Sequence, residues 1–142
     1  MIFSHGNNQK AYNNIITGQG GPCGTGIQLD YGANAPKVYN NTIYGNNGSG
    51  VSIGSASSLA VVKNNIVFSN GSTLIDLGSG TVQSNNFTSD PGFVNPASAD
   101  FHLQSSSQAI NRGAVLTEVS DDFDGTPRPQ GTTWDIGAYE YR

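Results

Sequence analysis

Several polar side chains recur where a repeating sheet would present them on one surface. Gln28, Ser52 and Asp76 are each 24 residues apart, and Asp30 and Tyr31 follow closely after the first of them. Amides and carboxylates hydrogen-bond to sugar hydroxyls, and aromatic rings pack on sugar rings. Gln28, Asp30, Tyr31, Ser52 and Asp76 are therefore predicted to form a carbohydrate-binding face that takes a polysaccharide or oligosaccharide.

The two aspartates of this face do not have the spacing of a glycosidase pair. Two repeats of a stacked sheet and two residues separate Asp30 from Asp76, which corresponds to roughly 12 Å. Retaining and inverting glycosidases need carboxylates about 5 to 9.5 Å apart. A Ser-His-Asp hydrolase would have only His5 or His102 as its base, and the Gly-x-Ser-x-Gly elbow is missing. We assign no catalytic residue from the sequence.

The element that would position this face is a recurring Asn-Asn step. It occurs at Asn13-Asn14, Asn40-Asn41, Asn64-Asn65 and Asn85-Asn86, and apolar residues follow it each time. The intervals between successive steps are 27, 24 and 21 residues. A period of this size is typical of a solenoid.

Each repeat contains three short apolar or β-branched runs separated by Gly, Asn and Ser clusters, such as the runs at 37–39, 42–44 and 50–53. No window shows the 3.6-residue periodicity that a helical repeat needs. Three strands per repeat of about 24 residues predict an all-β fold, a right-handed parallel β-helix of about three rungs.

The period also predicts which side chains point inward. Alternate residues of a strand face opposite sides, so inward rows and outward rows can be assigned. The predicted inward rows are Ile27, Val51 and Ile75 with Leu29, Ile53 and Leu77 in the first sheet; Ala11, Val38, Val62 and Val82 in the second; and Ile16, Ile43 and Val67 in the third. The predicted outward rows of the first sheet are Gln28, Ser52 and Asp76, then Asp30, Gly54 and Gly78. The asparagines are predicted to stack at the bend between the second and third sheets, which is a structural role.

Two irregularities interrupt the period: an insertion in the first rung and a shortening of the last rung, where the interval from Ile75 to Asn86 is 11 rather than 14 residues. Residues 18–26 carry a three-residue insertion that borders the first sheet, and counting back places Ile2 in the position of Leu29. An open first rung exposes unpaired backbone groups and the end of the core. We therefore expect either that the chain is the C-terminal piece of a longer β-helix or that it self-associates through its first rung.

Composition excludes several classes of partner. Only 11% of residues are charged and the net charge is −4, with six scattered Lys and Arg residues, so no nucleic acid or anionic membrane partner is expected. No apolar run approaches about 20 residues, so no membrane insertion is expected. Cys23 is the single cysteine and is read as a small residue of the Gly-rich loop.

Residues 1–86 are predicted to form the rungs and residues 87–142 a C-terminal capping segment of the same domain. A strand is expected over 100–103 and one helical turn over 107–113. Asp122 and Asp124 resemble the start of a Ca²⁺ loop but lack its remaining ligands, so Ca²⁺ is the one cofactor considered, with Asp122 and Asp124 as the candidate metal ligands. The favoured alternative places Arg128 between Asp124 and either Asp135 or Glu140.

The tail carries a family resemblance. Asp-Gly-x-x-Arg at 124–128, followed by Asp-Ile-Gly-Ala-x-Glu at 135–140, resembles the C-terminal region of secreted bacterial β-helix proteins of the pectate-lyase-like superfamily, in particular those with a choice-of-anchor-Q tail. The resemblance implies an extracellular or cell-surface protein that handles polysaccharide. Lyases of this kind use several acidic residues to hold Ca²⁺ plus an Arg or Lys base, whereas this first sheet offers only Asp30 and Asp76.

The sequence therefore predicts a polysaccharide-binding or scaffold portion of an extracellular bacterial β-helix protein. One alternative is a carbohydrate-active enzyme, either a polysaccharide lyase or a glycoside hydrolase. The other is a structural spacer module at the cell surface.

Overall fold

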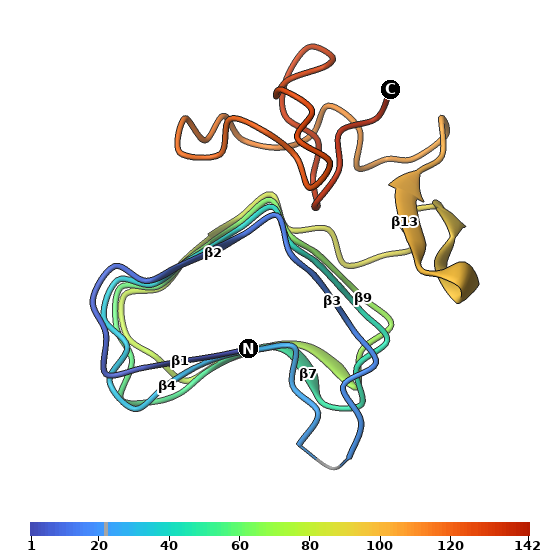
Figure 1. Cartoon of the computed structure of the whole chain (residues 1–142). Helices are drawn as coiled ribbons and strands as arrows, with labels where there is room; N and C mark the ends of the chain where they lie inside the picture. Colours follow the sequence, from blue (N-terminus) through green and yellow to red (C-terminus); the bar gives the residue numbers. More distant parts are fainter. Residues whose placement is uncertain (22) are drawn as a thin grey trace.

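Equivalent strands of successive repeats pair in parallel and form three sheets. The computed structural model describes residues 1–21 and 23–142 and shows a β-solenoid with the tail at its side (Figure 1). The first sheet contains β1 (Ile2–Ser4), β4 (Ile27–Asp30), β7 (Ser49–Ile53) and β10 (Ser72–Asp76). The second contains β2 (Lys10–Tyr12), β5 (Lys37–Tyr39), β8 (Val61–Lys63) and β11 (Val82–Ser84). The third contains β3 (Ile15–Thr17), β6 (Thr42–Tyr44) and β9 (Ile66–Phe68). The predicted all-β parallel β-helix of about three rungs is confirmed, and the described residues include no helix long and apolar enough to cross a membrane.

The core follows the predicted inward rows through the central rungs. Val38 pairs with Val62, and Ile43 with Val67. Ile27, Leu29, Val51 and Ile53 are completely buried. Because neighbouring rungs place these side chains directly over one another, a continuous apolar column fills the solenoid.

Buried asparagines hold neighbouring rungs together at the bend between the second and third sheets. The backbone N–H and side-chain amide of Asn41 both donate to Asn65 Oδ1, at 3.0 and 2.9 Å. Asn65 donates to Asn86 Oδ1 in the same way, at 3.0 and 2.9 Å. Asn41 and Asn65 are fully buried, so the predicted asparagine ladder is confirmed. A second ladder, in which Asn46 donates to Asn70, lies after the third sheet.

The predicted register is wrong in the last rung. Leu74, not Ile75, lies opposite Val51, and Asp76 lies opposite Ile53. The connection from β9 to β10 is one residue shorter than the connection from β6 to β7, and a one-residue shift turns every side chain to the other face. Ile75 and Leu77 are therefore 42% and 66% exposed. The connection from β10 to β11 is two residues shorter than the connection from β7 to β8, and Gln83 rather than Val82 lies opposite Val62.

Polar groups occupy inward positions of this last rung. Asp76 Oδ1 accepts hydrogen bonds from Gly78 N–H and the Thr81 hydroxyl, and Asp76 Oδ2 accepts one from Gln83 Nε2 at 3.1 Å. Inward-pointing charged residues discourage a further strand from pairing with an edge. The apolar pattern therefore stops at the rung where the core meets solvent.

The first rung also differs from the prediction. Phe3 lies opposite Leu29, and Ile2 lies opposite Gln28, because the connection from β1 to β2 is one residue shorter than the connection from β4 to β5. Phe3 packs against the core. The three-residue insertion over 18–26 is confirmed by the pairing on either side of it, although Pro22 within it lies outside the described residues.

After Phe87 the chain leaves the solenoid and runs along its side rather than over an end (Figure 1). This tail contains β12 (Phe93–Asn95), a short 3₁₀ turn, η1 (Pro96–Ser98), and β13 (Asp100–Leu103). The strand over 100–103 is confirmed, and residues 108–111 form a hydrogen-bonded turn. The strand over 93–95 was not predicted.

The first asparagine of every Asn-Asn step binds the tail. All four adopt left-handed backbone angles, with φ between 47° and 57°. Each side-chain amide donates to a tail carbonyl: Asn13 to Asp121, Asn40 to Asp135, Asn64 to Ala114, and Asn85 to Arg112, at 2.6 to 2.9 Å. One step therefore serves two purposes, since its second asparagine joins the rungs and its first holds the tail.

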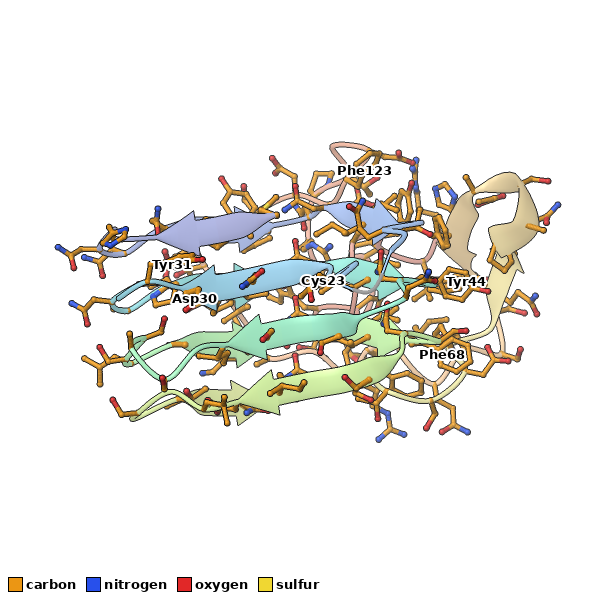
Figure 2. The ribbon with its side chains drawn as sticks, turned by 90° about the horizontal axis from the view of Figure 1, so that it is seen from below. Cys23, Asp30, Tyr31, Tyr44, Phe68 and Phe123 are labelled. Atoms are coloured by element: carbon orange, nitrogen blue, oxygen red, sulfur yellow. The ribbon has the colours of Figure 1, made fainter. Side chains whose placement is uncertain are left out.

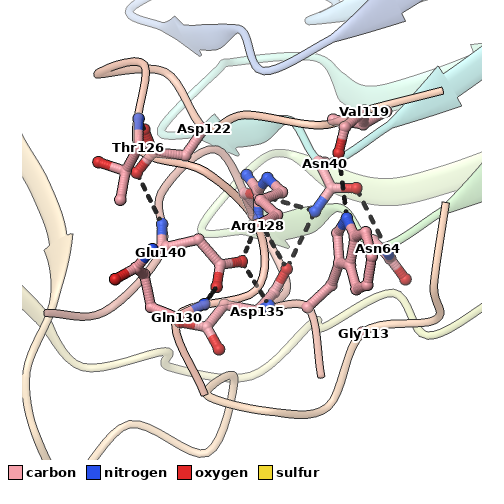
Figure 3. Close-up of polar contacts among 12 residues, drawn as sticks. Asn40, Asn64, Gly113, Val119, Asp122, Thr126, Arg128, Gln130, Asp135 and Glu140 are labelled. Carbon is pink, nitrogen blue, oxygen red and sulfur yellow. Dashed lines mark hydrogen bonds and ion pairs between the residues drawn. The ribbon is translucent and has the colours of Figure 1, made fainter. Parts of the chain in front are cut away.

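A buried ion pair lies at the centre of the tail (Figure 3). Arg128 Nη1 donates to Glu140 Oε1 at 2.7 Å, and both side chains are fully buried. The remaining Arg128 nitrogens donate to Asp121 O and Gly137 O, at 3.1 and 3.0 Å. Burial lowers the pKa of Arg128 and raises the pKa of Glu140, and the attraction between the two charges opposes both shifts. The predicted partner Glu140 is confirmed, whereas Asp124 is not a partner of Arg128.

A second hydrophobic core lies between the tail and the outer face of the third sheet. Ile66, Phe101 and Tyr139 are among its buried members. Tyr44 and Phe68 pack against it, with ring centroids 6.1 Å apart. These two aromatic rings pack against each other with their planes tilted by 41°, and they have the structural role predicted for them.

Replacing Asn65 by alanine should destabilise the solenoid by about 2–4 kcal/mol, because its partners Asn41, Asn86 and the Val38 carbonyl would be left unpaired in the interior. Urea unfolding followed by circular dichroism measures the change. Asn47→Ala is the matched control, since Asn47 is exposed and should change stability by less than about 0.5 kcal/mol. Equal losses for the two variants would contradict the ladder.

Candidate functional site

Within the part of the chain that the structure describes, the outer face of the first sheet is the large sheet surface that the tail leaves uncovered. Tail residues lie against the outer sides of the second and third sheets, and the first sheet faces the other way (Figure 1). Figure 2 is a view onto this face and shows its parallel strands side by side. We call it the open face, defined by the outward residues of β4, β7 and β10.

The open face changes character from rung to rung. Gln28 pairs with Ser52, which pairs with Ile75, and these three residues form one outward row. The next outward row has Asp30 on β4 and continues through Gly54 to Leu77. The face therefore has polar groups on β4, small residues on β7 and apolar side chains on the last rung.

The predicted position of Asp76 on this face is wrong. Ile75 occupies the place beside Ser52, and Asp76 faces the end of the core, where it is hydrogen-bonded to Thr81 and Gln83. Gln28, Asp30 and Ser52 lie on the outward rows as predicted. Four of the five predicted residues therefore remain together, with Tyr31 next to Asp30.

Asp30 is oriented by its neighbours on β4. Its Oδ2 accepts a hydrogen bond from Gln28 Nε2 at 3.1 Å, and its Oδ1 accepts one from the Tyr31 backbone N–H at 2.8 Å. A side chain at Gly54 would overlap Asp30 Oδ1, so the carboxylate extends over the bare backbone of the next rung. Each oxygen of a carboxylate has two lone pairs, so one on each remains available to a ligand.

Tyr31 lies in a tight turn at the end of β4. Its φ is 50°, and Ala33 N–H closes the turn on Asp30 O at 3.2 Å. The Tyr31 side chain is 59% exposed. His5 has the same conformation in the preceding rung, with φ of 51°, and its ring stacks on Tyr31 with centroids 5.9 Å apart and planes 14° apart. The two rings form a platform beside Asp30.

His5 was not predicted as a site residue. The signal was present, because His5-Gly6 and Tyr31-Gly32 are the same ring-then-glycine turn in successive rungs. The interval between them also equals the interval that pairs Phe3 with Leu29.

The inserted loop lies at the other end of the same strands. Its described residues, 18–21 and 23–26, project beyond the first sheet (Figure 1), and exposed Cys23 is separated from Asp30 and Tyr31 along the strand direction (Figure 2). The open face is thus bounded by this loop at one end and by the His5–Tyr31 platform at the other.

The candidate metal ligands of the tail have protein partners. Asp122 Oδ1 accepts hydrogen bonds from the N–H groups of Asp124 and Thr126, and Asp122 Oδ2 accepts one from Glu140 N–H at 3.0 Å. Within residues 1–21 and 23–142, no group of three or more His, Cys, Asp or Glu side chains is arranged to hold a metal. A Ca²⁺ ion at Asp122 and Asp124 stays a prediction.

A second cluster joins the tail hairpin to the last residues of the chain. His102 Nδ1 bonds Asp100 Oδ1 at 2.7 Å, and His102 Nε2 bonds Asp124 Oδ2 at 3.1 Å. The imidazole stacks on Tyr139, and Arg142 also pairs with Asp124. Burial lowers the pKa of His102, but hydrogen bonds to the two carboxylates outweigh that effect, so the pKa is raised overall. His102 and Arg142 of this cluster line a cavity of about 530 Å³ together with Gln104 and Tyr141.

The comparison with known families concerns the solenoid directly. A family model described as "Right handed beta helix region" matches residues 1–110. The chain belongs to this right-handed β-helix family. No curated protein and no solved structure matched the chain. The family assignment establishes the fold and its handedness, and it does not identify a ligand.

The His102 cluster predicts a pH-dependent contribution to stability. Because the folded pKa of His102 is raised, its contribution is fully present below the unfolded value of about 6.5 and is lost as pH rises through the folded pKa. The hydrogen bond from His102 lowers the pKa of Asp100. The stability that the Asp100 carboxylate contributes is therefore lost as pH falls below about 3.9. His102→Gln should therefore destabilise the protein more at pH 5.5 than at pH 8.5, as measured by urea unfolding at both values. A loss that is independent of pH would show that only packing on Tyr139 matters.

Proposed function

We propose that this chain is the polysaccharide-binding portion of an extracellular bacterial β-helix protein and that the open face is its binding site. The observation that carries the proposal is the Asp30 carboxylate, which Gln28 orients over Gly54 beside the exposed ring of Tyr31. An extracellular or cell-surface location is proposed from the tail motif at 124–128 and 135–140, which resembles that of secreted β-helix proteins.

The arrangement has the two kinds of group that bind a sugar. The ring of Tyr31, stacked on His5, offers a flat apolar surface on which a pyranose can pack. The free lone pairs of Asp30 accept hydrogen bonds from hydroxyl groups, and hydrogen bonds to an ionised acceptor are about twice as strong as neutral ones. Ser52 and Gly54 leave room between these groups and the exposed Ile75 and Leu77.

The enzyme alternative requires a second carboxylate near Asp30, and the described residues of this face do not supply one. A glycosidase needs two carboxylates that flank the scissile bond, and Asp76 has turned away from the outward row. The four strands of the first sheet contain neither Lys nor Arg, so the described face has no base of the kind that a β-helix lyase uses. Binding therefore fits the open face better than catalysis does.

Calorimetric titration with a panel of oligosaccharides tests the proposal. Asp30→Ala and Tyr31→Ala should each weaken binding at least tenfold, about 1.4 kcal/mol, because each removes one kind of sugar contact. Tyr12→Ala is the matched control, since Tyr12 is a 46%-exposed tyrosine on the second sheet. Its affinity should equal that of the wild type.

The outcomes separate the three candidate functions. Binding without products, lost in the Asp30 and Tyr31 variants, supports the proposal. New reducing ends or unsaturated products in the same mixtures would support a carbohydrate-active enzyme. No binding by the wild-type chain across the panel would leave the spacer module and overturn the proposal.

A further inference from the structure

We infer that the open face takes polysaccharides built from neutral or amino sugars and rejects chains of uronic acids. The inference rests on the proposed function and names the chemical class of its ligand. It follows from the charges around Asp30 and from the hydrogen-bonding character of the groups that point at the ligand.

The Lys and Arg side chains lie away from the open face. Lys10, Lys37 and Lys63 are on the second sheet, and Arg112, Arg128 and Arg142 are in the tail. Four of the six are also paired: Lys10 and Lys37 with Glu118, Arg128 with Glu140, and Arg142 with Asp124. A sugar carboxylate placed on the open face would therefore meet Asp30 with no Lys or Arg among the described first-sheet residues to neutralise it.

The polar groups that β4 presents on the open face, Gln28 and Asp30, mainly accept hydrogen bonds. An ionised carboxylate is an acceptor only, and Asp30 already uses one Gln28 N–H, so the Gln28 side chain presents its oxygen and one remaining N–H. Sugar hydroxyls and ammonium groups donate hydrogen bonds and satisfy such acceptors. A uronate carboxylate is negatively charged and only accepts hydrogen bonds. It is therefore repelled by the charge of Asp30 and has no hydrogen to donate to the Asp30 oxygens.

The geometry keeps the Asp30 charge where the ligand must pass. The carboxylate extends over Gly54, at the end of the face that carries the platform of His5 and Tyr31, and the small residues of β7 lie beside it. A chain that packs on Tyr31 and continues across Ser52 and Gly54 therefore passes directly by Asp30. Selection by charge follows from this position.

Matched oligosaccharides test the inference. Neutral and uronic-acid hexamers of the same configuration and linkage, in gluco, manno and galacto series, are titrated into the whole chain at pH 8. The best neutral member should bind at least tenfold more tightly than its uronate counterpart at low salt. The ratio should shrink in 0.5 M NaCl, because salt screens charge repulsion.

Three variants separate charge from shape. Asp30→Asn keeps the size of the side chain and removes its charge, so the ratio of neutral to uronate affinity should fall severalfold. Tyr31→Ala should weaken both ligands by the same factor and leave the ratio unchanged. Gly54→Ala should displace the Asp30 carboxylate and lower the ratio, while the fold is kept because only the end of a flexible side chain has to move.

The possible results are distinguishable. A wild-type chain that binds uronates as tightly as neutral sugars, or an Asp30→Asn variant with an unchanged ratio, overturns the inference and leaves the binding function standing. A wild-type chain that binds no member of any series overturns the proposed function as well.

Discussion

The structure depends on the Asn-Asn step at the bend between the second and third sheets. A left-handed residue followed by an extended one sends two consecutive amides to opposite sides of the backbone. Asn41 and Asn65 point inward and satisfy buried backbone groups of adjacent rungs. Asn40 and Asn64 point outward and donate to tail carbonyls. The same dipeptide therefore builds the solenoid and fixes the tail to it, because a buried amide is stable only when its hydrogen bonds are made.

The site follows from where that tail is held. The outer asparagines and the aromatic core under Tyr44 and Phe68 bind the tail to the second and third sheets, so the first sheet keeps a free outer face. On that face the rung sequence places Asp30 next to a residue without a side chain, Gly54, and this gives the carboxylate space over the sheet. The buried pair of Arg128 and Glu140 joins two segments of the tail on the far side, away from the open face.

Periodicity predicted the parts of the structure that repeat and failed where the repeat changes length. The inward positions of Val38, Val62 and Ile43 and the stacking of Asn41 on Asn65 follow from a constant interval. The position of Asp76 was predicted wrongly because the loop between β9 and β10 is one residue shorter than the equivalent loop of the preceding rung. The length of the whole rung does not show whether the missing residue lies before or after the strand. The path of the tail has no period, so its contacts with Asn40 and Asn64 could not be predicted. His5 was missed for the related reason that its rung is one residue short before β2.

Hydrogen exchange tests the division of labour within the Asn-Asn step most directly. In an Asn40→Gly, Asn64→Gly double variant the left-handed backbone is retained, while two of the four amides that hold the tail are removed. The account predicts that peptides from residues 112–141 lose protection from exchange severalfold while peptides from β4 to β9 keep theirs. Equal loss of protection in the rungs and the tail, or unchanged protection in the tail, would contradict it.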